Sequence, residues 1–323
     1  MPTGSLHLGN YLGAIVHWVN LQRRYESFFC VVDLHAITTP QDPRELHDKT
    51  REVAALFIAS GIDPRISTIF VQSAVPAHAE LCWMLNCITS MGRLERMIQF
   101  KEKAGKERES ASVGLFDYPV LQAADILLYG GEPPRTVLVP VGADQRQHLE
   151  LARDLAARFN RRYGVIFCEP EPIISEAGAR IMGLQYPLKK MSKSEKNPLD
   201  TLRLLDTPDE IRQKIAKAVT GPGREVRFDV EQPGLYNLLT IYELLSKKSR
   251  PEIEAHFRGK GYAEFKRELA ELVINSLRPL QERYQEIRRD PRYLEDVLKD
   301  GSTRARAESE VVLRAAMTAM GLG

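Results

Sequence analysis

Residues 186–198 read YPLKKMSKSEKNP. Pro187 and Pro198 lie near the two ends of this stretch, and prolines so close together rule out a long helix through it, so we expect a loop. The loop collects ammonium and hydroxyl groups around one methionine: Lys189, Lys190, Met191, Ser192, Lys193 and Ser194. Such groups suit a polyanion, for example a triphosphate, that must be bound and then released. The lysines alone would favour a solvated basic surface loop, so a partner motif is needed to decide.

A second segment of interest lies at the N-terminus, where residues 2–14 read PTGSLHLGNYLGA. Its glycines keep the backbone permissive and close to a ligand. A helix that begins here offers free N–H groups and a positive dipole to phosphate. A histidine alone is more often structural than catalytic, but His7 together with Gly9, Asn10 and the lysine–serine loop indicates a nucleotide site.

Length and composition limit the classes of protein to consider. A chain of 323 residues can bury a large core and most readily forms two domains. Its 45 basic and 43 acidic residues nearly cancel, so any nucleic-acid binding requires a local patch. The four cysteines show no CxxC spacing, which argues against a zinc site or a disulfide framework. No stretch is typical of a membrane span or a signal peptide, so we expect a soluble, cytoplasmic protein.

Short apolar runs alternate with amphipathic ones over the first 200 residues. The apolar runs predict buried strands over residues 28–33, 67–72 and 136–141. A helix between the first two is marked by Asp42 as N-cap, Pro43 at the first position and Gly61 past the end. Further helices are predicted over residues 76–89, 93–101, 120–129 and 144–163. This alternation predicts an α/β fold with a parallel sheet covered on both faces, and ligands beyond the carboxyl ends of its strands.

The pattern changes after Pro198, where strand signals disappear. Thr207 and Glu210 form a capping box that predicts a helix through residue 219, and the chain is helical and heavily charged from about residue 235. We therefore predict an α/β domain over residues 1–199 and a smaller all-helical domain over residues 200–302. One alternative is that the last helix, about residues 303–323, packs back on the first domain.

Together these motifs resemble the class I aminoacyl-tRNA synthetases, which carry an HIGH-type segment early in the chain and a KMSKS loop late in the catalytic domain. The closest resemblance is to the bacterial tryptophanyl-tRNA synthetases, through residues 2–14 and through two further stretches. Residues 116–127 (FDYPVLQAADIL) are similar to that family's amino-acid-pocket helix, and residues 139–148 (VPVGADQRQH) to its VPVGxDQxQH stretch. The resemblance implies a Rossmann-type catalytic domain and a helical domain that binds the tRNA anticodon. It also implies tryptophan–tRNA ligase activity on tRNA(Trp), with ATP as substrate together with Mg²⁺, no resident metal or prosthetic group, and a homodimer.

The resemblance also implies roles for individual residues. Catalytic roles fall on His7, Asn10, Lys190, Lys193 and Ser194. ATP-binding roles fall on these five and on Pro2, Thr3, Gly9, Lys103, Gly142, Ala143, Asp144, Ile181, Met191 and Ser192. Tryptophan-binding roles fall on His35, Tyr118, Gln122, Asp125, Val139, Val141 and Gln145.

The residues themselves give a physical reason for a role of Asp125. It lies in an otherwise apolar helix, between Ala123-Ala124 and Ile126-Leu127, where an unpaired carboxylate is costly. An indole N–H, which can only donate, would satisfy such a buried acceptor. A helix-surface aspartate is the alternative, and the apolar neighbours weaken it.

Three features depart from the family pattern. Gln122 stands where many bacterial members have methionine, which could change how the indole is held. Residues 130–138 (GGEPPRTVL) form a longer link than usual, which we expect to protrude as a surface loop. The family normally has a strand, central to the sheet, before the segment at Pro2; we expect either a start assigned too late or a truncated form that is poorly stable.

Other functions stay open from the sequence. A tyrosyl-tRNA synthetase shares both motifs and gains support from Gln122, whereas Asp125 and its alanines oppose it. A small nucleotidyltransferase has an HxGH motif like HLGN but does not explain the full KMSKS loop or the helical domain. A non-catalytic RNA-binding paralogue is the third rival. In the helical domain, Arg250, Lys260 and Lys266 are candidate RNA contacts, for which a solvated face is an equal alternative.

Overall fold

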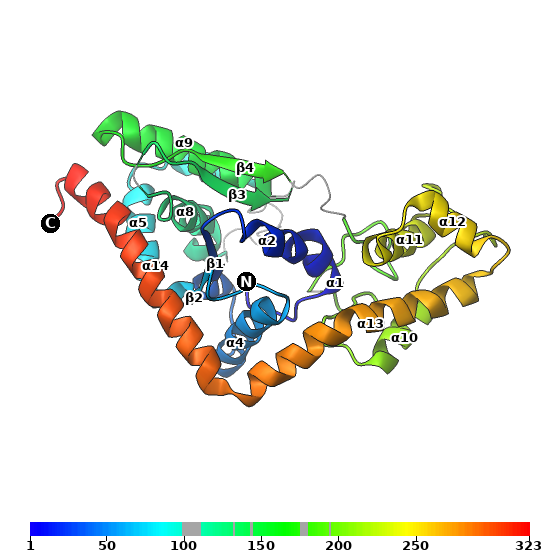
Figure 1. Cartoon of the computed structure of the whole chain (residues 1–323). Helices are drawn as coiled ribbons and strands as arrows, with labels where there is room; N and C mark the ends of the chain where they lie inside the picture. The colour runs from blue at the N-terminus through cyan, green and yellow to red at the C-terminus, as the bar shows by residue number, and fades with distance from the viewer. Residues whose placement is uncertain (99–110, 132, 143–144, 175–179, 194) are drawn as a thin grey trace.

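The structure is a computed structural model that describes residues 1–98, 111–131, 133–142, 145–174, 180–193 and 195–323. Figure 1 shows an α/β part built from the first half of the chain and a helical part built from residues beyond 200. Two long helices at the C-terminal end connect them. Four of the expected ATP-site residues lie outside the described ranges: Lys103, Ala143, Asp144 and Ser194.

The strands pair in two parallel couples. β1 (Ser27–Val31) pairs with β2 (Ser67–Val71), with Ser27 opposite Ser67. β3 (Val137–Val141) pairs with β4 (Pro170–Ile174), with Val137 opposite Pro170. The three predicted strands are therefore confirmed to within two residues at each end.

The sequence pattern did not predict β4. Its residues, PEPII, include two prolines, which argue against a strand. Prolines are tolerated in edge strands. Among the described residues β4 pairs with β3 alone, as an edge strand does.

Each couple is a βαβ unit whose crossover is a helix. α4 (Pro43–Ala59) joins β1 to β2, and α9 (Arg146–Tyr163) joins β3 to β4. The Asp42 carboxylate accepts hydrogen bonds from the N–H groups of Arg44 and Glu45, both at 2.9 Å, which confirms the predicted start of α4. α4 ends just before Gly61, whose positive φ of 107° stops the helix.

Three further helices cover the α/β part: α5 (Ala77–Asn86), α6 (Met91–Glu95) and α8 (Val113–Leu127). α8 begins earlier than the predicted residue 120, because the Ser112 side chain caps it and the helix continues through Pro119. α6 is shorter than the helix predicted over residues 93–101, whose last residues lie outside the described ranges.

We expected one parallel sheet, whereas the described strands form two separate couples. A cavity of about 430 Å³ lies between β1 and β3. Consecutive residues of both strands line it, Ser27 to Cys30 from β1 and Val137 to Pro140 from β3, so it runs along the strand edges.

The helical part begins with α10 (Pro208–Lys217), α11 (Pro233–Ser246) and α12 (Arg250–Phe257). The capping box at its start is confirmed, since the Thr207 N–H donates to the Glu210 carboxylate at 2.7 Å and the Glu210 N–H donates to the Thr207 hydroxyl at 3.3 Å. α10 ends two residues before the predicted Val219, because the backbone leaves the helical region at Ala218.

Two long helices return the chain to the α/β part. α13 (Tyr262–Arg289) runs from the helical part to α4, and α14 (Pro291–Ala319) runs back along β2 and α5 (Figure 1). On α14, Arg304 donates to the Pro64 carbonyl at 2.9 Å and Arg306 to the Ala74 carbonyl at 2.7 Å. The last helix thus lies against the first part of the chain, and it begins at Pro291, well before the start near residue 303 predicted from sequence.

The closeness of α14 to β2 gives a stability prediction. A Cβ atom added to Gly301 would overlap the carbonyl oxygen of Ile69, so Gly301→Ala is expected to lower the free energy of unfolding by about 1–3 kcal/mol or more. Gly92→Ala is the matched control, since it too is helical but its nearest contact would be 3.7 Å away at Arg96. The control should be neutral or stabilise by up to roughly 1 kcal/mol. Equal denaturation midpoints for the two variants would contradict this packing.

Candidate active site

The N-terminal segment is held in place by a second segment far along the chain. The Leu8 N–H donates to the Leu202 carbonyl at 2.8 Å, and the Leu204 N–H donates to the Leu6 carbonyl at 2.9 Å. A short helix, α1 (Leu8–Asn10), follows at once and leads through η1 (Tyr11–Ile15) into α2 (Val16–Leu21). The segment predicted to bind phosphate therefore lies at a helix start, as expected.

His7 and Asn10 cap this helix together. The His7 Nδ1 accepts from the Asn10 N–H at 3.3 Å, and the Asn10 Oδ1 accepts from the His7 N–H at 3.2 Å. Because Nδ1 accepts, the ring proton of a neutral His7 lies on Nε2, which can donate to a phosphate oxygen. Burial, followed by the ammonium groups of Lys193 and Lys190, lowers the pKa of His7 to about 4, so the ring is neutral at pH 7.

The lysine–serine loop is anchored through its backbone and one side chain. Its described residues contain no helix, as predicted. The Met191 N–H donates to the Ile181 carbonyl at 3.0 Å, and the Thr201 hydroxyl donates to the Ser192 carbonyl at 3.0 Å. The Met191 side chain is only 2% exposed. It lies in an apolar cluster rather than facing a nucleotide, so a contact between Met191 and ATP would have to come from its backbone.

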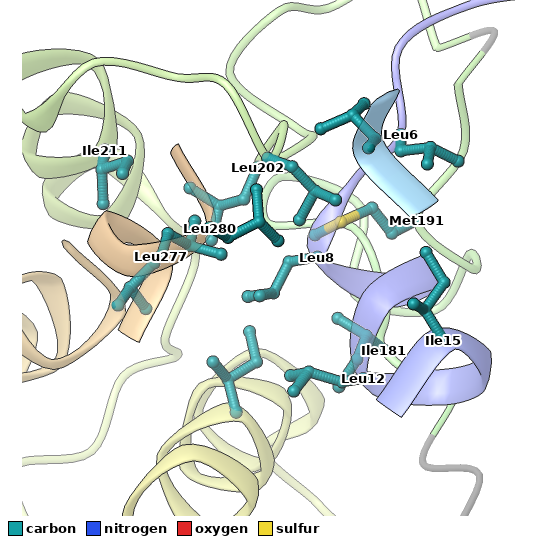
Figure 2. Close-up of a cluster of buried hydrophobic side chains, with 14 of the residues drawn as sticks. Leu6, Leu8, Leu12, Ile15, Ile181, Met191, Leu202, Ile211, Leu277 and Leu280 are labelled. Carbon is teal, nitrogen blue, oxygen red and sulfur yellow. The ribbon is translucent and has the colours of Figure 1, made fainter. Parts of the chain in front are cut away.

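Figure 2 shows this apolar cluster, which joins three parts of the protein. Met191 and Ile181 come from the loop region, Leu8 from α1, and Leu277 and Leu280 from α13; all five side chains are buried. The loop and the N-terminal segment thus share one core with the long helix that reaches from the helical part. Since such cores are close-packed, a shift of α13 would also displace the loop.

Two glycines allow the N-terminal segment to approach the loop. Gly4 has a φ of 151°, and a Cβ atom there would lie 3.4 Å from the Cβ of Lys193. A Cβ atom on Gly9 would lie 3.1 Å from the His7 Nδ1 and 3.5 Å from the Cβ of Ile181. Pro2 is buried and Thr3 exposed next to Gly4. The structure therefore brings most of the described residues expected at the ATP site into one place.

Lys193 is surrounded by residues that sequence reasoning missed. Its ammonium donates to the Met1 carbonyl at 3.3 Å. On α4, the Lys49 ammonium donates to Glu52 at 2.8 Å and to the Ser5 hydroxyl at 3.2 Å. Burial lowers the pKa of Lys193 to about 8, while Glu52 raises it and Lys49 lowers it. The signal in the sequence was a charged pair three residues apart on the predicted helix, but nothing there indicated which element it faces.

The pKa of Lys193 predicts a pH dependence. The ammonium that is predicted to counter phosphate charge is present below its pKa of about 8, so kcat/KM for ATP should be constant below pH 8. Above pH 8 it should fall by up to about tenfold per pH unit as the charge is lost. Lys193→Arg keeps its charge throughout this range, so its profile should be flat whatever its absolute rate. The same decline in the arginine variant would assign the titration to another group.

The residues expected to bind tryptophan lie together around α8 of the α/β part. Tyr118, Gln122 and Asp125 occupy one face of α8, at spacings of four and three residues. The Gln122 amide donates to the Gln145 side chain at 3.1 Å, and the His35 ring centroid lies 6.2 Å from that of Tyr118. Gln122 is thus oriented by Gln145, which is how the structure accommodates this departure from the family pattern.

The remaining residues predicted on this side come from β3 and the turn after it. Val139 and Val141 share one face of β3, and Val139 lines the cavity together with Asp125. Gly142 is exposed directly after β3, and its carbonyl accepts from the Gln145 N–H at 3.0 Å. Strand and turn thus lead from the cavity to the start of α9.

The Asp125 carboxylate differs from our expectation, because three donors in the protein already hold it. Oδ1 accepts from His78 Nδ1 at 2.6 Å and from Gln72 Nε2 at 2.7 Å, and Oδ2 accepts from His35 Nε2 at 2.7 Å. Burial alone would raise the pKa of Asp125, but hydrogen bonds from His35 and His78 hold it below its ordinary value. We had expected a carboxylate left for the substrate alone.

Gln72 and His78 were missed, although their positions carried a signal. Gln72 ends the predicted strand over residues 67–72, and His78 begins the following helix. Polar residues at the carboxyl end of a parallel strand are candidates for a site. Only the fold, however, brings them within hydrogen-bonding distance of Asp125, about 50 residues further along the chain.

The three candidate RNA contacts in the helical part all have partners within the chain. The Arg250 side chain donates to Glu243 at 3.2 Å and lies 4.7 Å from the centre of the Phe228 ring. Lys260 lies 3.6 Å from Glu264. Lys266 donates to the Ala216 and Ala218 carbonyls, at 3.1 and 2.7 Å, and so caps the end of α10. These contacts give each residue a role in the fold.

The described part of the chain has neither a metal-binding cluster nor a membrane-spanning helix. No group of three or more His, Cys, Asp or Glu side chains there could hold a metal ion. No helix there is long and apolar enough to cross a membrane.

Comparison with known proteins supports the reading of these motifs. A family model described as tRNA synthetases class I (W and Y) matches residues 1–278. The tryptophan–tRNA ligase of Gloeobacter violaceus is 54% identical over 321 residues, which are 99% of this chain and 94% of that protein. The crystal structure of tryptophanyl-tRNA synthetase from Mycoplasma pneumoniae is similar with a TM-score of 0.88 and 34% identity, over 98% of this chain and 94% of that chain.

A further solved structure is that of the Campylobacter jejuni tryptophanyl-tRNA synthetase, crystallised with ADP and tryptophan. It matches with a TM-score of 0.84 and 35% identity, over 99% of this chain and 98% of that chain. The similarity covers the α/β part and the helical part alike. Neither a small nucleotidyltransferase nor a tyrosyl-tRNA synthetase explains such matches. The chain therefore belongs to the class I tRNA synthetases for tryptophan and tyrosine and, within them, to the tryptophanyl-tRNA synthetases of bacterial type.

Proposed function

We propose that this chain activates L-tryptophan with ATP and transfers it to tRNA(Trp); it is a tryptophan–tRNA ligase. The observation that carries the assignment of the site is the meeting of the two motifs. The turn of Gly4 to Asn10 packs against Lys193, and the Asp125 pocket lies in the same α/β part. Ligands of parallel α/β sheets bind in such places.

In the first step the tryptophan carboxylate attacks the α-phosphate of ATP. A tryptophanyl-adenylate forms, and the bond to pyrophosphate breaks. A carboxylate is already a nucleophile, so no general base is required. Lys190 and Lys193 oppose the charge that grows on the leaving pyrophosphate, while His7 Nε2–H, Asn10 and Thr3 hold the phosphates from the other side.

ATP binding involves further residues of this proposal. Ile181 lies beside Gly9 with its side chain buried like that of Met191, so its contact with adenine would come from its backbone, and Gly142 lies towards the ribose. Ser192 contributes on the loop, where Lys190 is exposed to solvent. The roles of Lys103, Ala143, Asp144 and Ser194 stay predictions, since these residues lie outside the described ranges.

Mg²⁺ enters with ATP as part of the substrate. It prefers phosphate oxygens and water to a cage made only of protein groups. The described residues offer no cluster that would bind it independently of the nucleotide.

In the second step the 2′-hydroxyl of the terminal adenosine of the tRNA takes the tryptophanyl group, and AMP leaves. The helical domain, residues 200–302, binds the anticodon. Tryptophan is distinguished from tyrosine by the shape of the pocket and by Asp125, and this degree of discrimination needs no editing domain. The reaction belongs in the cytoplasm, where translation uses its product.

The protein acts as a homodimer, and an exposed apolar surface supports this. Trp83 on α5, Met91 on α6 and Val113 on α8 are 72%, 67% and 81% exposed, although all are large and apolar. These helices are neighbours, since the Asn86 amide of α5 donates to Asp117 of α8 at 2.8 Å.

Trp83→Glu is expected to convert a dimer into 36.6-kDa monomers, because it places a charge in the interface core. Sedimentation equilibrium measures the mass. Val230→Glu changes an equally exposed residue, 74% exposed, in the helical part and should leave the dimer intact. A monomeric wild type at micromolar concentration would rule the dimer out.

The exchange of radioactive pyrophosphate into ATP tests the activity, with tryptophan and tyrosine in parallel. We expect exchange that depends on tryptophan. Exchange that depends on tyrosine would overturn the role of Asp125. If neither amino acid supports exchange and the protein still binds tRNA, the non-catalytic paralogue is indicated.

A further inference from the structure

Behind the Asp125 carboxylate lies a chain of buried hydrogen bonds that the proposed mechanism does not use. His78 Nδ1 contacts Asp125 Oδ1 at 2.6 Å, and His78 Nε2 contacts the Tyr129 hydroxyl at 2.8 Å. We call Asp125, His78 and Tyr129 the carboxylate relay.

The contacts determine which nitrogen of the neutral His78 ring carries the proton. A carboxylate only accepts, so Nδ1 of His78 carries a proton and donates it to Asp125. In the neutral ring Nε2 then accepts, and its partner is the Tyr129 O–H. His78 is 0% exposed, so no water competes for either nitrogen. The carboxylate thereby fixes the tautomer, and the Tyr129 hydroxyl provides the partner of the other nitrogen.

Counting acceptor sites shows what the relay leaves to a ligand. An ionised carboxylate has two oxygens with about four lone-pair sites. His78 and Gln72 occupy both sites of Oδ1, and both are 0% exposed, so Oδ1 faces the interior. His35 occupies one site of Oδ2. One acceptor site remains, and it lies on Oδ2.

The surroundings make this arrangement rigid. The Tyr129 ring stacks on Phe28 of β1 with centroids 4.6 Å apart, and it lies 5.5 Å from the ring of Phe70 of β2. The relay therefore begins at the cavity wall and ends in the packed core beside β1 and β2. Asp125 keeps 13% of its side chain exposed at the cavity, which is the side open to a ligand.

We propose that His78, with its second ring nitrogen held by Tyr129, is a positioning residue for tryptophan recognition: it saturates Asp125 Oδ1 so that only Oδ2 accepts the indole N–H. The inference rests on the proposed function, in which Asp125 binds the indole. It assigns specificity to residues that do not touch the substrate. Without the His78 donor the carboxylate could rotate or accept a hydrogen bond from water. The hydrogen bond from the ligand N–H would then contribute less to the preference for tryptophan.

The test compares two amino acids that differ at one atom. In 3-(3-benzothienyl)alanine, sulfur replaces the indole N–H while the shape is kept. The ratio of kcat/KM for tryptophan to that for this analogue, measured by pyrophosphate exchange, reports the N–H contact. The wild type should prefer tryptophan by about 10–150-fold, the range for one hydrogen bond to a charged group.

Four variants separate positioning from packing. His78→Leu should reduce the ratio at least fivefold, and Tyr129→Phe at least threefold. His78→Asn places an amide N–H near the position of Nδ1 and should restore the ratio to within threefold of wild type. Tyr242→Phe is the control, because it removes a buried hydroxyl that donates to Glu268 at 2.7 Å, far from the pocket, and it should leave the ratio unchanged.

The outcomes distinguish the inference from the proposed function. If His78→Leu lowers kcat/KM for both amino acids by one factor, His78 has a structural role only and the inference is wrong. If that variant does not fold, Tyr129→Phe decides, and an unchanged ratio overturns the inference. A wild type without any preference overturns the role of Asp125 itself, and the inference with it.

Discussion

Replacing Asp125 with asparagine is expected to lower kcat/KM for tryptophan by about 10²–10⁴. The loss has two parts. The indole N–H loses its charged acceptor, worth about 1.5–3 kcal/mol, and a buried donor is left unpaired at about 1–3 kcal/mol. The second part follows because His78 and Gln72 both donate to Oδ1, so the asparagine oxygen stays on that side and its NH₂ group, which cannot accept, faces the indole N–H in the complex.

Pyrophosphate exchange at several tryptophan concentrations measures this effect, and KM for ATP should change by less than about threefold. Asp117→Asn is the matched control. It is the same substitution on the same helix, and Asp117 accepts from Asn86 of α5 at 2.8 Å rather than from pocket residues. Its kcat/KM should stay within about threefold of wild type. If the Asp125 variant loses stability but keeps its kcat/KM within tenfold, Asp125 is structural and the indole is recognised elsewhere.

Replacing Lys193 with alanine is expected to slow adenylate formation by about 10²–10³, the range for removing one preorganised electrostatic contact to a transition state. Affinity for tryptophan should stay within about twofold, because Lys193 lies beside Gly4 and Lys49 and not at the Asp125 pocket. Single-turnover kinetics measure the rate, and tryptophan fluorescence quenching measures the affinity.

The loop offers a control for its overall charge. Lys196→Ala removes an exposed lysine three positions further along and should change the rate by less than about threefold. Equal losses of rate and tryptophan affinity in the Lys193 variant would contradict its assignment to the leaving pyrophosphate. Equal losses of rate in both variants would mean that the net positive charge of the loop, and not the position of Lys193, produces the effect.

The sequence was informative wherever a signal is local. Asp42, Pro43 and Gly61 delimit α4 because capping and positive φ are properties of a few neighbouring residues. Apolar runs located β1, β2 and β3 because burial on both faces leaves a continuous hydrophobic stretch. β4 was not predicted, because its prolines are not typical of a strand sequence.

By itself the sequence determined the class of the fold, the two motifs and the family, all of which depend on residue types at fixed spacings. Only the tertiary structure decided what surrounds them. Lys49 and Glu52 stand beside Lys193, and His78 holds Asp125 from behind, across segments far apart in the chain. Hydrogen bonds and Coulomb forces act within a few ångströms, and which groups come that close depends on the packing of whole elements.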